Sequence, residues 1–423
     1  MIDIKRIVED TQEIKKALLK RIPVKNIQLD EIVELENKRK ELQNKYDQER
    51  AEQNEYNSKM AKLDKGSEGF KELIEKLKEK SENVKKIENE LRETQKKITE
   101  LVEVLPNIPD EDVLAGGKEN NEITGSWGQK PKFDFKPKDH LELGESLGIL
   151  DFQTASKISG ANFSMYRGKG AQLEWALINY FVNEHIKDRY EMIIPPHIVN
   201  EQSAYSAGQL PKFKDDVYWV EDEHCLIPTA ETALTNIYRE EILEEDQLPQ
   251  KFFSYTPCYR KEAGSYRTNE RGLIRVHQFN KVEMYIFATQ EQSDELFDEL
   301  VNKAEKLVRD LGLHYNRVKL AAADCSAPAA KTIDIEVWLP VLKQYYEVSS
   351  ISNTREYQSR RGEMRYRSKD DGKIKYMHTL NASGLATSRL MVSLLETYQQ
   401  KDGSIVVPEI LQKYTGFDRI EAV

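Results

Sequence analysis

Apolar side chains recur every seven residues through a long segment near the N-terminus that is otherwise rich in Glu, Lys and Gln. They form two heptad positions, Phe70, Leu77, Val84, Leu91 and Ile98 in the first and Leu73, Ile87 and Leu101 in the second. A weaker apolar stripe precedes them, and between Pro23 and Pro106 the chain has no proline and only two glycines, Gly66 and Gly69. The pattern predicts two long helices that turn at residues 65–69 and pack as an antiparallel coiled coil.

Two interpretations of this helical arm, at about residues 28–103, are open. Most segments of this kind are dimerisation or spacer coiled coils whose charged faces are solvated. The alternative is an arm that grips RNA by its backbone, because phosphates attract basic side chains. The basic residues available for that role are Lys71, Lys76, Lys78, Lys85, Lys86, Arg92, Lys96 and Lys97.

The pattern changes after Pro106. Residues 110–130 are polar, and we expect them to form a linker. A mixed pattern of helices and strands follows to the end of the chain, with a helix predicted near residues 170–188. Residues 253–287 are rich in aromatic and β-branched side chains at both ends and charged in the centre, which predicts two antiparallel strands joined by a long loop.

This hairpin carries more charge than a purely structural strand pair needs. Arg260 and Arg275 offer guanidinium groups suited to phosphate oxygens, and Glu262 and Glu283 offer carboxylates suited to amines, hydroxyls or a cation. That combination favours an anionic, nucleotide-like ligand. A solvated hairpin with cross-strand ion pairs is the alternative.

Composition sets wider limits. With 423 residues, 39% of them hydrophobic, the chain can form a large core and a second module. The net charge of −10 excludes indiscriminate binding to nucleic acid, although basic side chains gathered on one face can still bind RNA.

There is no apolar run long enough for a bilayer and no signal-peptide core, so we expect a cytoplasmic protein without membrane contact. Cys225, Cys258 and Cys325 are too few and too far apart for a disulfide framework, and we expect them to pack in the core.

The central hairpin resembles motif 2 of the seryl-tRNA synthetases, a family of class II aminoacyl-tRNA synthetases. The resemblance rests on Arg260 and Glu262 to Gly264, on residues 271–275 and on residues 277–283, all at fixed spacing. Further stretches that resemble the family are residues 127–152, 226–231, 334–340, 346–353 and, as motif 3, 380–389. The resemblance covers essentially the whole chain. It implies an α+β fold, with a class II catalytic domain of antiparallel β-sheet and helices at residues 111–423, preceded by a tRNA-binding domain at residues 1–110 that contains the helical coiled-coil arm.

The same resemblance implies the residues of the site. Those expected to bind serine are Thr229, Ala230, Glu231, Glu283 and Ser383. Those expected to bind ATP are Arg260, Lys261, Glu262, Glu347, Val348, Ser349, Ser350 and Arg389, with Arg275 and Asn381 as further candidates. The phosphate-binding sequence GxxxxGK[ST] is absent, so side chains must hold the phosphates. We expect Glu347 to hold Mg²⁺ against them, since magnesium prefers carboxylate and phosphate oxygens.

The implied activity is that of a serine–tRNA ligase. L-Serine reacts with ATP to give seryl-adenylate, and serine then passes to the 3′ end of tRNA(Ser), with tRNA(Sec) as a further acceptor. In this family the arm holds the tRNA, and motif 1 builds a homodimer. Motif 1 would be the helix from about Gly170 followed by residues 190–196, in which Pro196 aligns best with the motif's proline, although Pro195 and Pro196 can equally be a plain strand terminator.

The chain also departs from the family's usual pattern. Glycines are usual at Arg189, Ala382 and Ser388, a cysteine is common at Ile351, Gly-Thr-Gly is usual at residues 206–208 and Gly-Arg-Asp-Thr at residues 267–270. We expect activation of serine to be retained, with Ala382 and Ser388 adding bulk near the ATP and serine sites and changing kinetics, inhibitor sensitivity or tRNA handling. Two alternatives stay open: a divergent paralogue that serves a specialised or antibiotic-resistance pathway, and a non-catalytic RNA-binding protein.

Overall fold

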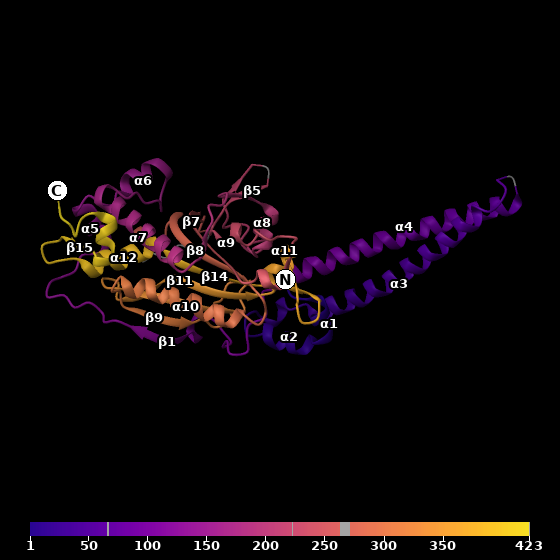
Figure 1. Ribbon diagram of the computed structural model, residues 1–423, viewed down its shortest axis with the longest axis horizontal. Coiled ribbons are helices and arrows are strands. Elements are labelled where there is room, and N and C mark those ends of the chain that lie inside the picture. Colours follow the sequence, from indigo (N-terminus) through magenta and orange to yellow (C-terminus); the bar gives the residue numbers. More distant parts are fainter. Residues whose placement is uncertain (66, 222, 263–270, 423) are drawn as a thin grey trace. The chain divides into compact units, whose positions relative to one another are not determined.

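The chain folds into two compact units in a computed structural model, Met1–Pro106 and Asn107–Val423 (Figure 1). The structure describes residues 1–65, 67–221, 223–262 and 271–422. None of the helices in these ranges has the length and apolar character needed to span a bilayer. The three cysteines are free and buried, as expected.

The N-terminal unit is helical. Its elements are α1 (Ile4–Glu9), α2 (Thr11–Leu18), the 3-10 turn η1 (Val24–Asn26), α3 (Leu29–Met60) and α4 (Glu68–Glu103). The two long helices lie side by side in Figure 1, which confirms the predicted arm. Ser67 caps the start of α4 by accepting a hydrogen bond from the backbone N–H of Phe70.

Polar residues at the predicted core positions of the arm are accommodated by local partners. The Nζ atom of Lys80 lies 3.0 Å from Glu49 and 2.7 Å from Glu52, so it makes an ion pair across the two helices. Thr94 is buried, and its hydroxyl donates to the backbone oxygen of Glu90. Apolar packing is therefore interrupted at two heptad positions, while Val84 and Ile98 are buried as the pattern predicts.

A mainly antiparallel sheet forms the centre of the second unit. Within the described residues its eight strands have the order β1-β9-β10-β11-β14-β8-β7-β2. Their bounds are β1 (Glu122–Trp127), β2 (Glu191–Met192), β7 (Gln250–Tyr259), β8 (Gln278–Ala288), β9 (Tyr315–Lys319), β10 (Lys331–Leu339), β11 (Gln344–Arg355) and β14 (His378–Ala386). Within this sheet, over the described residues, β2 and β7 pair in parallel and the other neighbouring strands pair antiparallel. The pairing of β7 with β8 confirms the predicted hairpin.

Helices pack on this sheet, and apolar side chains of the sheet and the helices together form the hydrophobic core. The helical elements are η2 (Lys118–Asn120), α5 (His140–Ser146), α6 (Phe152–Ser159), α7 (Gly168–Lys187), α8 (Glu201–Ser206), α9 (Glu231–Leu234), η3 (Glu245–Gln247), η4 (Gly272–Ile274), α10 (Ser293–Asp310), α11 (Tyr357–Gly362), α12 (Thr387–Tyr398) and α13 (Glu409–Thr415). α10 shows why such helices bury one face, because Leu296, Leu300 and Leu307 recur at helical spacing and join the core. The described residues of this unit also form three smaller sheets. The first holds β3 (Ile198–Asn200), β5 (His224–Leu226) and β4 (Trp219–Val220), the second β13 (Ile374–Tyr376), β12 (Arg365–Arg367) and β6 (Ile242–Glu244), and the third β15 (Ile405–Val406) and β16 (Arg419–Ile420).

The prediction of a linker at residues 110–130 is wrong. Residues Glu122–Trp127 form β1, which pairs with β9 at the edge of the large sheet. One face of an edge strand can remain in water, so its residues need not be apolar, and that is why the segment resembles a loop in sequence.

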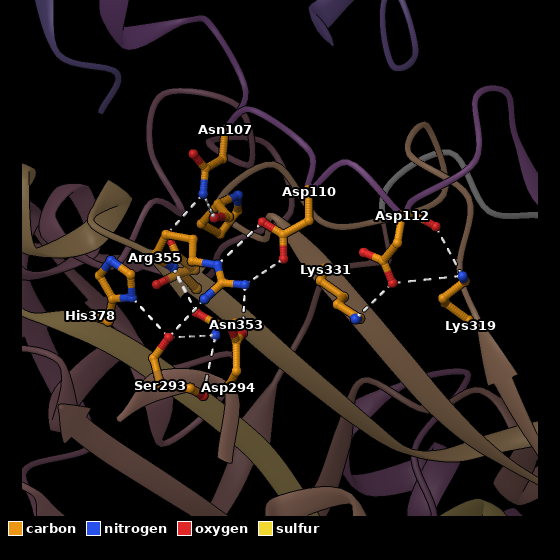
Figure 2. Close-up of polar contacts among 12 residues, drawn as sticks. Asn107, Asp110, Asp112, Ser293, Asp294, Lys319, Lys331, Asn353, Arg355 and His378 are labelled. Carbon is orange, nitrogen blue, oxygen red and sulfur yellow. Dashed lines mark hydrogen bonds and ion pairs between the residues drawn. The ribbon is translucent and has the colours of Figure 1, made fainter. Parts of the chain in front are cut away.

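Ion pairs also tie the start of the second unit to the sheet (Figure 2). The guanidinium group of Arg355 lies 2.6 Å from the carboxylate of Asp110 and 2.7 Å from that of Asp294. Asp112 pairs with Lys331 at 2.8 Å, and the amide of Asn107 donates to the backbone oxygens of Pro328 and Thr354. These contacts fix the segment before β1 against β10, β11 and α10.

Candidate active site

A cavity of about 410 Å³ opens over strands β7, β8, β11 and β14. Of the residues expected to bind ligands, those that line it are Thr229, Glu231, Arg260, Glu262, Arg275, Glu283, Glu347, Ser350, Asn381, Ser383 and Arg389. They come from segments as far apart in the sequence as residues 229 and 389. The fold therefore brings motif 2 and motif 3 to one place with the stretches at residues 226–231 and 346–353.

Two carboxylates and one lysine form the polar floor of the cavity. Nζ of Lys281 lies 2.5 Å from Oε2 of Glu283 and donates to Oγ1 of Thr229 at 2.7 Å. The hydroxyl of Ser383 donates to Glu283 at 3.4 Å. Lys281, Glu283, Thr229 and Ser383 are all buried, so hydrogen bonds rather than water satisfy these polar groups.

Glu231 is the second carboxylate of the floor. Its Oε1 atom accepts hydrogen bonds from Nε2 of Gln358 at 2.7 Å and from Nδ2 of Asn381 at 3.0 Å. Desolvation raises the pKa of Glu231 to about 7, and the negative charge of Glu283 acts in the same direction. Desolvation also raises the pKa of Glu283, while Lys281 lowers it. At neutral pH the Glu231 carboxyl is thus close to its titration point.

Arginines occupy other positions around the cavity. Arg260 donates through Nε to the backbone oxygen of Pro228 and lies over the ring of Phe279. Arg275 pairs with Glu262 at 2.5 Å, and both residues lie in the connection between β7 and β8. Arg389, near the start of α12, pairs with Glu347 at 3.4 Å and donates to its backbone oxygen. These three guanidinium groups give the cavity positive charge suited to phosphate oxygens.

Four of the expected ligand-binding residues do not line the cavity. Ala230 and Val348 are buried in the core, and Lys261 is exposed, with its Nζ near the ring of Tyr218. Ser349 is buried, and its hydroxyl donates to the backbone oxygen of Ser383 at 2.5 Å, so it supports a lining residue. Ala263, Gly264 and residues 267–270 of the motif 2 loop lie outside the described residues.

Lys281 and Gln358 are parts of the site that the sequence reasoning missed. Lys281 lies two residues before Glu283 on β8, and residues at this spacing share one face of a strand. That spacing was a usable signal. Gln358 lies on α11, in a stretch without a ligand-binding pattern, so only the fold reveals its contact with Glu231.

The departures at Ile351 and Ala382 face each other. The two residues are direct partners across β11 and β14, and both are fully buried in the core. Ala382 alternates with the cavity-lining residues Asn381 and Ser383, so its methyl group enters the core on the opposite face of β14. Ser388 is buried beside Arg389 and does not line the cavity either. The expected extra bulk near the ligands is therefore not placed in the cavity at either position.

Comparison with known proteins agrees with this geometry. Residues 1–109 match the family described as the seryl-tRNA synthetase N-terminal domain, and residues 214–398 match the tRNA synthetase class II core domain (G, H, P, S and T). The protein named serine–tRNA ligase 2 of Clostridium acetobutylicum is 51% identical, with 99% of this chain and 100% of that protein covered. The chain belongs to the seryl-tRNA synthetase family.

Solved structures of seryl-tRNA synthetases have the same fold. The enzyme from Pyrococcus horikoshii, solved in complex with ATP, superposes with a TM-score of 0.94 at 34% identity, and each chain is covered in full. The cytoplasmic serine–tRNA ligase of Naegleria fowleri, solved with AMP, gives 0.87 at 27% identity over 100% of this chain and 99% of that one. The expected class II α+β fold with an N-terminal helical arm is confirmed.

Proposed function

We propose that this member of the family is a working serine–tRNA ligase that activates L-serine with ATP and transfers it to tRNA(Ser), with tRNA(Sec) as a further acceptor. The observation that carries the proposal is this cavity, because it holds the buried carboxylate of Glu283, the partly buried carboxylate of Glu231 and a hydroxyl at its floor, with three arginines around it. A carboxylate floor suits an ammonium and a hydroxyl, and the arginines suit a triphosphate. The ATP and AMP in the solved relatives support the same ligand here.

The residues have distinct roles in this proposal. Thr229, Glu231, Glu283 and Ser383 hold the ammonium and hydroxyl of serine, and Ala230 shapes the turn beneath them. Arg260, Arg275 and Arg389 hold the phosphates and stabilise the charge that develops on them. Glu262, Ser350 and Asn381 complete the lining of the proposed ATP site, whereas Lys261, Val348 and Ser349, which the resemblance also implies there, do not line the cavity.

The chemistry requires no protein nucleophile. A carboxylate oxygen of serine attacks the α-phosphorus of ATP, the bond from phosphorus to the bridging oxygen breaks, and pyrophosphate leaves. The terminal ribose hydroxyl of the tRNA then attacks the carbonyl carbon of the adenylate, and AMP leaves. Positioning by the cavity and charge stabilisation by its arginines supply the catalysis.

Magnesium fits the cavity only as a partner of the nucleotide. Among the described residues no group of three or more His, Cys, Asp or Glu side chains could hold a metal ion. Glu347 lines the cavity with a half-exposed carboxylate, so it can supply one oxygen while the phosphates supply others. Bound there, Mg²⁺ would neutralise phosphate charge.

The N-terminal domain, residues 1–110, would bind the tRNA, and residues 111–423 would catalyse the reaction. The basic side chains of α4 proposed for the tRNA backbone are all exposed. A homodimer is supported by apolar side chains exposed near Pro196, including Ile194, whose exposed fraction is 81%. We place the enzyme in the cytoplasm.

Exchange of labelled pyrophosphate into ATP, followed by charging of tRNA(Ser), tests the proposal. Exchange that requires serine, together with charging, is the expected result. A specialised paralogue would exchange with serine and fail to charge tRNA(Ser). A non-catalytic RNA-binding protein would show no exchange.

A further inference from the structure

We propose that Gln358 is a positioning residue that orients Glu231 for serine recognition. The inference rests on the proposed function, because it concerns the carboxylate at the floor of the serine site. Gln358 itself is fully buried and does not line the cavity. Its influence on the substrate therefore passes through Glu231.

The side-chain amide of Gln358 is held by five hydrogen bonds. Its Oε1 atom accepts from the hydroxyls of Tyr285 at 2.8 Å, Thr379 at 2.7 Å and Thr354 at 3.3 Å. Its Nε2 atom donates to the backbone oxygen of Ala207 at 3.0 Å and to Oε1 of Glu231 at 2.7 Å. The three hydroxyls come from β8, β14 and β11, which are neighbours in the large sheet.

These partners permit only one orientation of the amide. Turning it over would place its oxygen against the oxygens of Ala207 and Glu231, so Ala207 would lose this donor and Glu231 would keep only the hydrogen bond from Asn381. A buried polar group without a hydrogen-bond partner costs folding free energy, so the hydroxyls of the sheet hold the Gln358 amide in one orientation. In that orientation the amide directs one N–H at the carboxylate of Glu231. Through Gln358, the large sheet thus holds the side chain of Glu231, which lies on the four-residue helix α9.

Orientation matters because Glu231 lies close to a second carboxylate. In the described part of the chain, the hydrogen bonds that reach the side chain of Glu231 come from Gln358 and Asn381, and both end on Oε1. The Oε2 atom is thereby directed to the ligand. The hydrogen bond from Gln358 also lowers the pKa of Glu231, against the larger upward effects of desolvation and of Glu283.

Gln358→Met tests the proposal, because methionine keeps nearly the volume and removes both donors. Gln399→Met is a matched control. Gln399 is also buried and also bonded through its amide, to Lys138 and Glu396, and it does not line the cavity. Serine-dependent pyrophosphate exchange is measured for both variants and the unaltered protein, with KM for serine, KM for ATP and the pH profile.

For Gln358→Met we expect KM for serine to rise by about tenfold to a hundredfold, the range for loss of one hydrogen bond to a charged group, with KM for ATP within about twofold. The pH dependence of kcat/KM for serine should move to higher pH, because Glu231 loses a group that stabilises its ionised form. A purely structural lesion would change neither the ratio of the two KM values nor the pH profile. Gln399→Met should leave both unchanged.

Gln358→Leu provides a second variant if Gln358→Met does not fold. It introduces no charge and removes both amide donors, so the same rise in KM for serine is expected. An unchanged KM for serine and pH profile in a folded variant would overturn the inference, as would equal losses in Gln358→Met and Gln399→Met. Absence of exchange in the unaltered protein would instead contradict the proposed function itself.

Discussion

The ammonium of Lys281 lies 2.5 Å from the carboxylate of Glu283, and both side chains are buried at the floor of the cavity. Lys281 also donates to Thr229, so one cation joins two residues proposed to bind serine. A buried ion pair contributes little net stability when intact, but removal of one partner leaves an unpaired charge. Lys281 therefore sets the charge of the floor before serine arrives.

Lys281→Met should damage both folding and activity. The variant leaves Glu283 beside Glu231 without a cation, and we expect unfolding to become easier by about 3 kcal/mol. The pKa of Glu283 should rise further, since Lys281 lowers it in the unaltered protein. Urea denaturation and serine-dependent exchange measure the two effects. A variant with the stability and the serine KM of the unaltered protein would show that the pair has no role.

Activity should depend on pH through Glu231. Its pKa is raised to about 7, so the carboxyl is mostly protonated at pH 6 and mostly ionised at pH 8. The ionised form accepts hydrogen bonds from serine in our account, so kcat/KM for serine should rise as pH increases through about 7 and level off above about 8. The free energy of unfolding should depend on pH in the opposite direction. Because the pKa of Glu231 is raised in the folded state, this carboxyl stabilises the fold at low pH, and the contribution is lost as pH rises through 7.

Glu231→Gln is the control for that pH profile. Glutamine cannot ionise, so the rise near pH 7 should disappear while overall activity falls. Persistence of the same profile in Glu231→Gln would place the titrating group elsewhere.

Ala382→Gly restores the residue that is usual in the family, and we expect it to destabilise the protein. Ala382 is packed in the core opposite Ile351, so its loss removes a buried methyl group and adds backbone freedom to β14. The two effects together amount to about 1–2 kcal/mol. Serine and ATP KM values should stay within about twofold, because this face of β14 does not line the cavity. A clear change in either KM would show that Ala382 influences the ligands after all.

Arg189→Gly should stabilise the protein. Arg189 follows the C-cap of α7 with φ of 63°, a left-handed conformation that favours glycine. Relief of this strain is worth about 1 kcal/mol, measured as an upward shift in the urea midpoint without a change in slope. An unchanged or lower midpoint would mean that contacts of the arginine side chain offset the strain.

Periodicity explains which parts of the fold were predictable. The heptads of Phe70 and Leu73 and the apolar ends of the β7–β8 hairpin have a strong pattern, and their helices and strands were found. β1 was missed because a polar edge strand resembles a loop. Strand pairing over long sequence distances, as between Ile351 and Ala382, leaves no local pattern in a single sequence.

Some residues of the candidate site could likewise be predicted from the sequence, and others could not. Residues within motifs, such as Arg260 and Glu283, could be named from spacing and resemblance, and the cavity brings them together. Gln358 could not be named, because its role depends on hydroxyls from three strands that meet only in the folded sheet. Ala230 lies in sequence between two cavity-lining residues and Val348 directly follows one, yet the side chains of both are buried in the core.

The most direct test of the account is exchange of pyrophosphate into ATP by the purified, folded protein with Mg²⁺, with serine compared to threonine, alanine and glycine. We predict exchange with serine and background values with the other three. Alanine and glycine lack the hydroxyl and leave its polar partners in the floor unpaired, and threonine brings an additional methyl group that this floor must accommodate. Absence of exchange with all four amino acids, or equal exchange with alanine, would contradict the assignment of this cavity to serine activation.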